Sequence, residues 1–192
     1  MTFFNSPDVR KLTKEEFCEF NVQSSQPFKS DPSEVLSYNI ARGMMTDVKA
    51  VIHAEGHQTG NALGLMEVWW GAGDVAGPHV HTLEDEAFYI LDGELTLSIP
   101  GKVDRVPARK GEFVWAPRNM PHWYEVTGDE GAHVLVFEVP GGSLMSFFRG
   151  VAAGWGADIE SDEKLAEFAQ WSDEKFGIKF FPFDHPFQQP EW

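Results

Sequence analysis

Three histidines and one glutamate stand at spacings that suit a metal site. His79 and His81 lie two positions apart in a segment expected to be a strand, where alternate side chains point to the same face. Glu86 follows five positions later, and His122 comes after further expected strands. Three imidazole nitrogens and one carboxylate oxygen suit one divalent first-row transition metal: Fe, Mn, Co, Ni, Cu or Zn. On a five- or six-coordinate ion they leave a position open, which favours a catalytic site over a closed structural one.

The other four of the seven histidines are scattered along the chain: His53, His57, His133 and His185. A lone histidine needs partners before it forms a site. We therefore expect these four to be ordinary surface or interior histidines.

Short apolar runs, rich in β-branched and aromatic residues, surround the cluster. They occupy residues 63–70, 87–91, 95–99, 113–116, 122–127 and 133–139, with glycine and proline between them. Several alternate with period two, as Leu95 and Leu97 do against Thr96. The Asp92-Gly93 pair is typical of a tight hairpin. Without an internal repeat, this pattern predicts a single antiparallel barrel or sandwich.

Helices are predicted in the flanks. Residues 13–16 form a capping-box pattern that predicts a short N-terminal helix. Ser143 is a candidate N-cap for a helix over residues 144–151. A longer helix is predicted over residues 162–176, and Gly177 ends it as a C-terminal glycine does.

These elements divide the chain into three parts. Residues 1–47 are expected to be an N-terminal arm, residues 48–140 the barrel, and residues 141–192 a helical extension packed on the barrel. One face of the longer helix carries Leu165, Phe168, Ala169 and Phe176. The tail at residues 180–187 is strongly aromatic and is expected to pack over the barrel.

The spacing around the cluster resembles the two sequence motifs of the cupin superfamily. The first motif corresponds to five positions: Gly73, His79, His81, Glu86 and Gly93. The second corresponds to Gly111, Pro117 and His122. Asn119 stands where the second motif usually has glycine, and Val126 where it often has asparagine; neither is a ligand position. Asn tolerates a left-handed turn nearly as well as Gly, so the first departure is mild.

The resemblance implies a mainly β cupin barrel of the jelly-roll type, with His79, His81, Glu86 and His122 as its metal ligands. A rival interpretation is a cupin barrel in which these four form a buried polar network without a metal. Cupins include dioxygenases, decarboxylases, isomerases, lyases and binding modules, so the fold does not choose the reaction. The single barrel followed by C-terminal helices is similar to the quercetinase-like monocupins, which are flavonol dioxygenases.

Aromatic side chains near the cluster suggest the nature of the pocket. Strand alternation places Phe88 on the face of Glu86, and Tyr124 with Val126 on the face of His122. If their strand points them inward, Phe113 and Trp115 also line the cavity. Such a cavity suits a flat aromatic substrate, although each aromatic residue could equally be barrel core.

The resemblance implies a double role for Glu86, which would bind the metal and accept the proton of an enolic hydroxyl. The preferred function is a metal-dependent dioxygenase whose partners are a flavonol-like or other enolisable aromatic substrate and dioxygen. The alternatives are a non-oxidative isomerase, lyase or decarboxylase that uses the metal as a Lewis acid, and a non-catalytic small-molecule-binding cupin.

Composition excludes several other classes of partner. The net charge of −15 disfavours binding to nucleic acid and to anionic membranes. The longest apolar runs are far shorter than the roughly 20 residues of a membrane span. With one cysteine, Cys18, and no signal-peptide pattern, a cytoplasmic location is expected. Cupins often form homodimers, and the arm could contribute to one. Exchange of the arm between two chains and packing of the arm on its own barrel would give the same sequence pattern.

Overall fold

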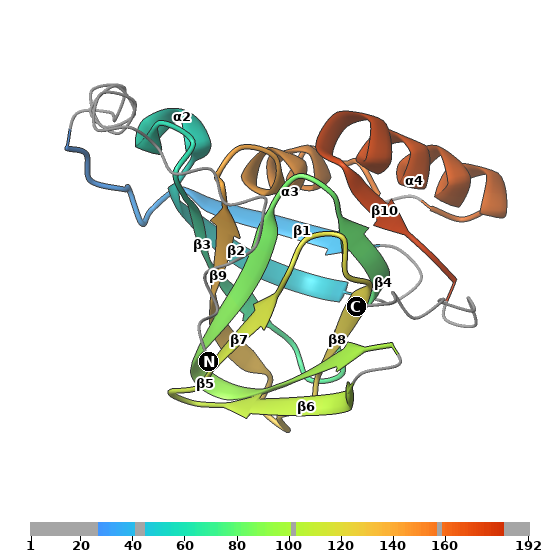
Figure 1. The fold of residues 1–192 in the computed structure, drawn as a ribbon, viewed down its shortest axis with the longest axis horizontal. Coiled ribbons are helices and arrows are strands. Elements are labelled where there is room, and N and C mark those ends of the chain that lie inside the picture. The colour runs from blue at the N-terminus through green and yellow to red at the C-terminus, as the bar shows by residue number, and fades with distance from the viewer. Residues whose placement is uncertain (1–26, 41–44, 101–102, 157–158, 183–192) are drawn as a thin grey trace, which may run out of the picture.

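The computed structural model describes residues 27–40, 45–100, 103–156 and 159–182. Within them the chain forms ten strands and three helices (Figure 1). The strands are β1 (Val35–Ile40), β2 (Met45–Ala54), β3 (Gly64–Trp70), β4 (Val75–His81), β5 (Asp85–Ile99), β6 (Val103–Arg109), β7 (Phe113–Ala116), β8 (His122–Val126), β9 (Ala132–Val139) and β10 (Ile178–Phe180). The helices are α2 (Gly56–Thr59), α3 (Leu144–Ala152) and α4 (Asp162–Phe176). The prediction of a mainly β antiparallel barrel with C-terminal helices is confirmed.

The long strand β5 joins the two halves of the barrel. Its first part pairs with β7 and β9, and its second part pairs with β6 and β8. The full order of the sheet is β1-β2-β3-β9-β5-β8-β4-β10, with β6 and β7 beside β5. Because one strand belongs to both halves, the sheet can fold around a single core.

The hairpin predicted at Asp92-Gly93 is wrong. The chain continues as β5 through this pair, and only the register against β9 shifts, between Ile90 and Asp92. Gly93 adopts a positive φ of 79° at this bend. The Asp-Gly pair therefore bends one strand from one half of the barrel into the other instead of reversing it.

The N-terminal side of the sheet begins before residue 48. β1 pairs with β2, and β2 pairs with β3, so residues 35–54 extend the sheet at its edge. These strands lack the clear alternation of the later ones, and β1 was not foreseen. The helix predicted around residues 13–16 lies outside the described residues.

The two C-terminal helices are confirmed. α4 spans the predicted residues; the Ser161 side chain accepts a hydrogen bond from the Lys164 N–H at its start, and Gly177 ends it with φ 68°. α3 also forms as predicted, but the side chain of Ser143 does not cap it. Both helices lie together over one end of the strands (Figure 1), where α3 contacts β1 and β3 and α4 contacts β10.

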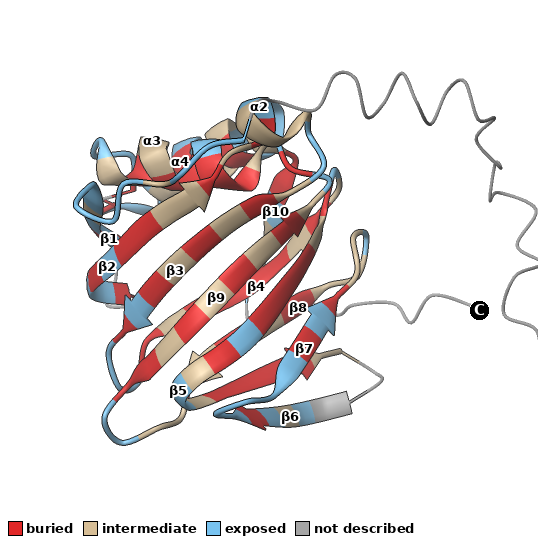
Figure 2. Cartoon of the chain, turned by 90° about the vertical axis from the view of Figure 1, so that its left-hand side faces the viewer, coloured by how far each residue is buried: buried red, intermediate tan, exposed pale blue. Residues whose placement is uncertain are grey.

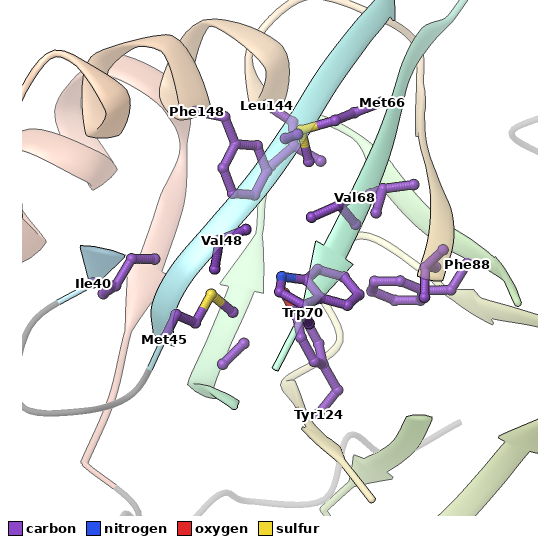
Figure 3. Close-up of a cluster of buried hydrophobic side chains, with 14 of the residues drawn as sticks. Ile40, Met45, Val48, Met66, Val68, Trp70, Phe88, Tyr124, Leu144 and Phe148 are labelled. Atoms are coloured by element: carbon purple, nitrogen blue, oxygen red, sulfur yellow. The ribbon is translucent and has the colours of Figure 1, made fainter. Parts of the chain in front are cut away.

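The core lies between the two halves of the barrel. Alternate residues of β3 and β9 are buried, which gives the banded pattern in Figure 2. Trp70, Phe88 and Tyr124 lie together in this core (Figure 3), with ring centroids 4.9 to 6.4 Å apart. Full burial of an aromatic side chain such as Phe88 stabilises a fold by about 1.5–3 kcal/mol.

Among the described residues, no helix has both the length and the apolar character that crossing a membrane requires.

Gly93 should be far less tolerant of a side chain than Gly111. Both have a positive φ, of 79° and 86°, but a Cβ on Gly93 would lie 2.1 Å from the Gly131 carbonyl oxygen, whereas one on Gly111 would meet nothing within 4 Å. Gly111→Ala should cost about 1–2 kcal/mol for the left-handed backbone alone. Gly93→Ala should cost about 1–3 kcal/mol more, because a neighbouring backbone must move. Urea unfolding of the two variants tests this, and equal losses would contradict it.

Candidate metal centre

Strand pairing brings the four predicted ligands together. His79 and His81 lie on β4, Glu86 lies near the start of β5, and His122 begins β8. His79 and His122 face each other across the β4–β8 pair. One potential ligand atom from each of the four residues lies within 4.8 Å of all the others.

Glu86 is the centre of this cluster. Its Oε2 lies 3.2 Å from Nε2 of His122, 3.4 Å from that of His81 and 3.9 Å from that of His79. All four residues are at most 5% exposed. The three Nε2 atoms therefore converge on one carboxylate oxygen in a site closed to bulk water.

Hydrogen bonds at the opposite ring nitrogens fix how the histidines are oriented. Nδ1 of His79 lies 2.7 Å from the Gly77 carbonyl oxygen, and Nδ1 of His122 lies 3.1 Å from that of Met120. Nδ1 of His81 lies 2.8 Å from Oε1 of Glu84. Each Nδ1–H donates to an oxygen, so each Nε2 is left to face the centre. Metal-binding histidines commonly use such partners to set their tautomer and ring orientation.

Burial and the neighbouring charges shift the pKa values of the cluster residues in different directions. Burial, aided by His122, lowers the pKa of His79 to about 4. Burial opposes a charge on His81 as well, but Glu86 and Glu84 raise its pKa to about 9. For Glu86, burial is outweighed by the charge of His81 and by the close ring nitrogens of the histidines, so its pKa lies well below the usual range. Any cation bound at His81 must displace a proton.

A small apolar cavity of about 40 Å³ adjoins the cluster. His79, His81 and Glu86 form its polar side. The other large side chains around it are apolar or aromatic: Ile40, Met45, Tyr124, Leu144, Phe147, Phe148, Ile178 and Phe180. Burial raises the pKa of Tyr124 far above its usual value, so its hydroxyl stays protonated beside the cluster.

The structure divides the four predicted pocket aromatics. Tyr124 lines the cavity, while Phe88 is fully buried in the core against Trp70 and Tyr124 (Figure 3). The expectation that Phe113 and Trp115 point inward is wrong: they are 55% and 43% exposed. On β7 the alternation runs the other way, with Val114 and Ala116 buried.

The aromatic wall of the cavity comes instead from the C-terminal extension. Phe147 and Phe148 lie on α3, and Phe180 lies on β10, where its ring centroid is 5.7 Å from that of His79. β10 pairs with β4 so that Ile178 lies opposite His81. Nothing in the local sequence pattern assigns these residues to the site, because the contact joins segments about 100 positions apart.

Glu84 is a functional residue that sequence reasoning missed. It is 1% exposed and holds Nδ1 of His81. The sequence does show acidic residues between His81 and Glu86. There are two of them, Glu84 and Asp85, and spacing alone does not indicate which one contacts His81. Asp85 turns away and pairs with Arg118, with Oδ2 2.9 Å from Nη2.

The two scattered histidines on the sheet each have a carboxylate partner. His53 and His133 lie 2.8 Å and 2.6 Å from different oxygens of Glu67. They lie apart from the cluster, and His57 is exposed. His185 lies outside the described residues.

The donor set fits a single divalent ion. Three imidazole nitrogens face one carboxylate oxygen, all four groups are buried, and the outer ring nitrogens are occupied by hydrogen bonds. Nitrogen and oxygen donors of this kind suit first-row transition metals, but they do not select one of them.

Comparison with known proteins agrees with this geometry. Residues 65–138 match the family described as Cupin domain. The chain is 29% identical over 133 residues to an acireductone dioxygenase of Alcanivorax borkumensis, a match that covers 65% of this chain and 71% of that protein. It is 31% identical over 77 residues to a quercetin 2,3-dioxygenase of Bacillus subtilis, covering 40% of this chain and 22% of that one.

A solved structure shares the fold. The crystal structure of a predicted oxalate decarboxylase from Thermotoga maritima superposes with a TM-score of 0.51 at 24% identity, over 59% of this chain and 99% of that one. At this identity the likeness concerns the fold alone. The strand topology, the buried three-histidine, one-glutamate cluster and the family match over residues 65–138 together show that the chain has a mainly β antiparallel barrel with the cupin fold.

Proposed function

We propose that this protein is a metal-dependent dioxygenase that acts on an enolisable, largely apolar substrate. The main support for this proposal is that four potential ligands converge beside an apolar cavity: His79, His81, Glu86 and His122. The two dioxygenase relatives support the oxidative reaction, although both are distant. Acireductone and quercetin, named in those relatives, both carry an enol hydroxyl next to a carbonyl group.

The four clustered side chains would hold one divalent first-row ion. When bound, the ion would supply a place where an enolate and dioxygen can meet. Glu86 would accept the proton of the enol hydroxyl, since it is the carboxylate among the residues that line the cavity. Tyr124, Phe147 and Phe148 would pack against the substrate and keep water from the reacting atoms.

An aromatic substrate suits the cavity walls but not the present size of the cavity. Phe147, Phe148, Phe180 and Tyr124 offer ring faces and edges to a flat molecule. About 40 Å³ is far below the roughly 300–1,000 Å³ of typical ligand pockets. A flavonol therefore requires α3 or the segment around Phe180 to move outward, whereas a compact enolisable ketone requires a smaller movement.

Metal content tests the ligand assignment. Purified wild-type protein should hold about one transition-metal ion per chain, and His81→Ala and Glu86→Ala should hold much less, because each change removes one of four donors. Elemental analysis by mass spectrometry measures this. His57→Ala, which alters an exposed histidine, is the control and should match the wild type. Equal metal content in all four proteins would overturn the assignment.

Oxygen uptake tests the reaction. Protein loaded with Fe, Mn, Co or Ni should consume dioxygen with a flavonol or a smaller enolisable aromatic ketone, as followed with an oxygen electrode. Glu86→Ala should lose turnover by at least about 100-fold, in the range typical of a lost general base, even where some metal remains. Conversion of substrate without oxygen uptake would favour an isomerase, lyase or decarboxylase instead. No consumption with any of these metals and substrates would refute the dioxygenase proposal.

A further inference from the structure

A buried chain of polar groups joins the metal centre to the start of α3. Nδ1 of His81 lies 2.8 Å from Oε1 of Glu84, and the other oxygen of Glu84 accepts a 2.5 Å hydrogen bond from the hydroxyl of Ser143. Ser143 directly precedes α3. The loop between β4 and β5, which carries Glu84, arches beside this helix in Figure 1. Two hydrogen bonds therefore connect a ligand histidine to the residue before α3, more than 60 positions away in the sequence.

The start of α3 is fixed to the barrel by a second carboxylate. Oε1 of Glu138, on β9, accepts hydrogen bonds from the backbone N–H groups of Gly142, Ser143 and Leu144, at 2.8, 2.5 and 2.8 Å. Leu144 is the first residue of α3, and its N–H is one of the donors that a helix leaves without an internal partner; Gly142 and Ser143 directly precede the helix. Glu138 is fully buried and lies opposite Glu86 in the β5–β9 pair. The position of Ser143 is thus set by the strand next to the metal centre.

Ser143 has one hydroxyl hydrogen and two carboxylates within reach. Its Oγ is 2.5 Å from Glu84 but 3.3 Å from Glu138, so the hydrogen belongs to the bond with Glu84. Oε1 of Glu138, the oxygen that faces Ser143, already accepts from the three backbone N–H groups. The hydroxyl is therefore the group that holds the outer oxygen of Glu84, while His81 holds the inner one.

Arg118 contacts the residues on both sides of Glu84. Its guanidinium donates to the Leu83 carbonyl oxygen at 3.1 Å and to Oδ2 of Asp85 at 2.9 Å. It also donates to the Val139 carbonyl oxygen at 3.0 Å, at the end of β9. Arg118 thus holds both neighbours of Glu84, and His81 and Ser143 each engage one oxygen of its carboxylate, which sets the orientation of that carboxylate.

α3 is also a wall of the cavity. Leu144, Phe147 and Phe148 all line it, together with His81 and Glu86. A movement of α3 that shifts Leu144 with Phe147 and Phe148 would also displace Ser143 from Glu84, because Leu144 and Ser143 are adjacent. The cavity wall and the ligand histidine are therefore parts of one hydrogen-bonded unit.

We propose that Ser143 is a positioning residue of the metal centre, which links the seating of α3 to the orientation of His81 through Glu84. This rests on the metal site of the proposed function but not on its oxidative chemistry. Because coupling between two sites is reciprocal, a bound metal stabilises the closed position of α3, and a ligand that lifts α3 weakens the hold on the metal.

Titration with Co²⁺ alone tests this without any turnover. We expect Glu84→Gln to weaken Co²⁺ binding by about 10- to 100-fold, the range known for groups that orient metal ligands, and Ser143→Ala to weaken it by up to about 10-fold. The visible absorption of the Co²⁺ form should change in both variants, because the ring of His81 is freed to rotate. Ser143→Thr keeps the hydroxyl and should restore both the affinity and the spectrum.

Ser146→Ala is the matched control, because it removes a hydroxyl from an exposed position of the same helix. A purely structural role of Ser143 would lower the melting temperature of the metal-free and Co²⁺-loaded forms equally, and this outcome would overturn the proposal. A smaller Co²⁺-induced rise in melting temperature for Ser143→Ala than for Ser146→Ala supports it. Wild-type protein that binds Co²⁺ but consumes no oxygen when loaded with Fe, Mn, Co or Ni would refute the dioxygenase and leave this test intact.

Discussion

The metal centre depends on the hydrogen bonds at the outer nitrogens of its three histidines. A buried imidazole without a partner at Nδ1 could turn about its χ2 axis and present either nitrogen to the centre. Backbone carbonyl oxygens of Gly77 and Met120 prevent this for His79 and His122, and a carboxylate does so for His81. Two of the three constraints are therefore part of the strand and loop backbone. The third, at His81, depends on side chains, so it is the one that other parts of the molecule can influence.

The ligand set could be predicted from sequence because its geometry is local. Two histidines on alternate positions of a strand share a face by the period of the strand itself, and the glycine positions of both motifs sit where φ is positive. Asn119 confirms this logic: it stands in place of glycine and adopts φ 61°. The hydrogen-bond partners of the Nδ1 atoms were harder to predict, because every residue has a backbone carbonyl oxygen and the sequence does not show which one faces a histidine. The sequence shows an acidic residue at position 84, but it does not show that Glu84 contacts His81.

The errors have a common physical origin in long-range packing. Alternation along β7 showed that two aromatic residues share a face, but only the pairing with β5 determines which face is inward. The Asp-Gly pair permits a positive φ, and the bend of β5 uses that freedom without reversing the chain. The cavity walls come from α3 and β10, whose apolar residues fit an ordinary helix face and a short strand equally well. Their role depends on where the C-terminal extension docks, which local periodicity does not encode.

The docking of β10 has a consequence for the solubility of this fold. Within the described residues β10 is the last strand of the sheet beyond β4, and it pairs with the three positions of β4 that include both ligand histidines. Without it, the backbone N–H and carbonyl groups of β4 would form an open sheet edge, which readily recruits strands from other molecules. A chain shortened before Ile178 would thus expose an aggregation-prone edge at the same place where it loses the wall beside His79. The three residues of β10 thus cover the edge of β4 at both ligand histidines as well as shaping the cavity.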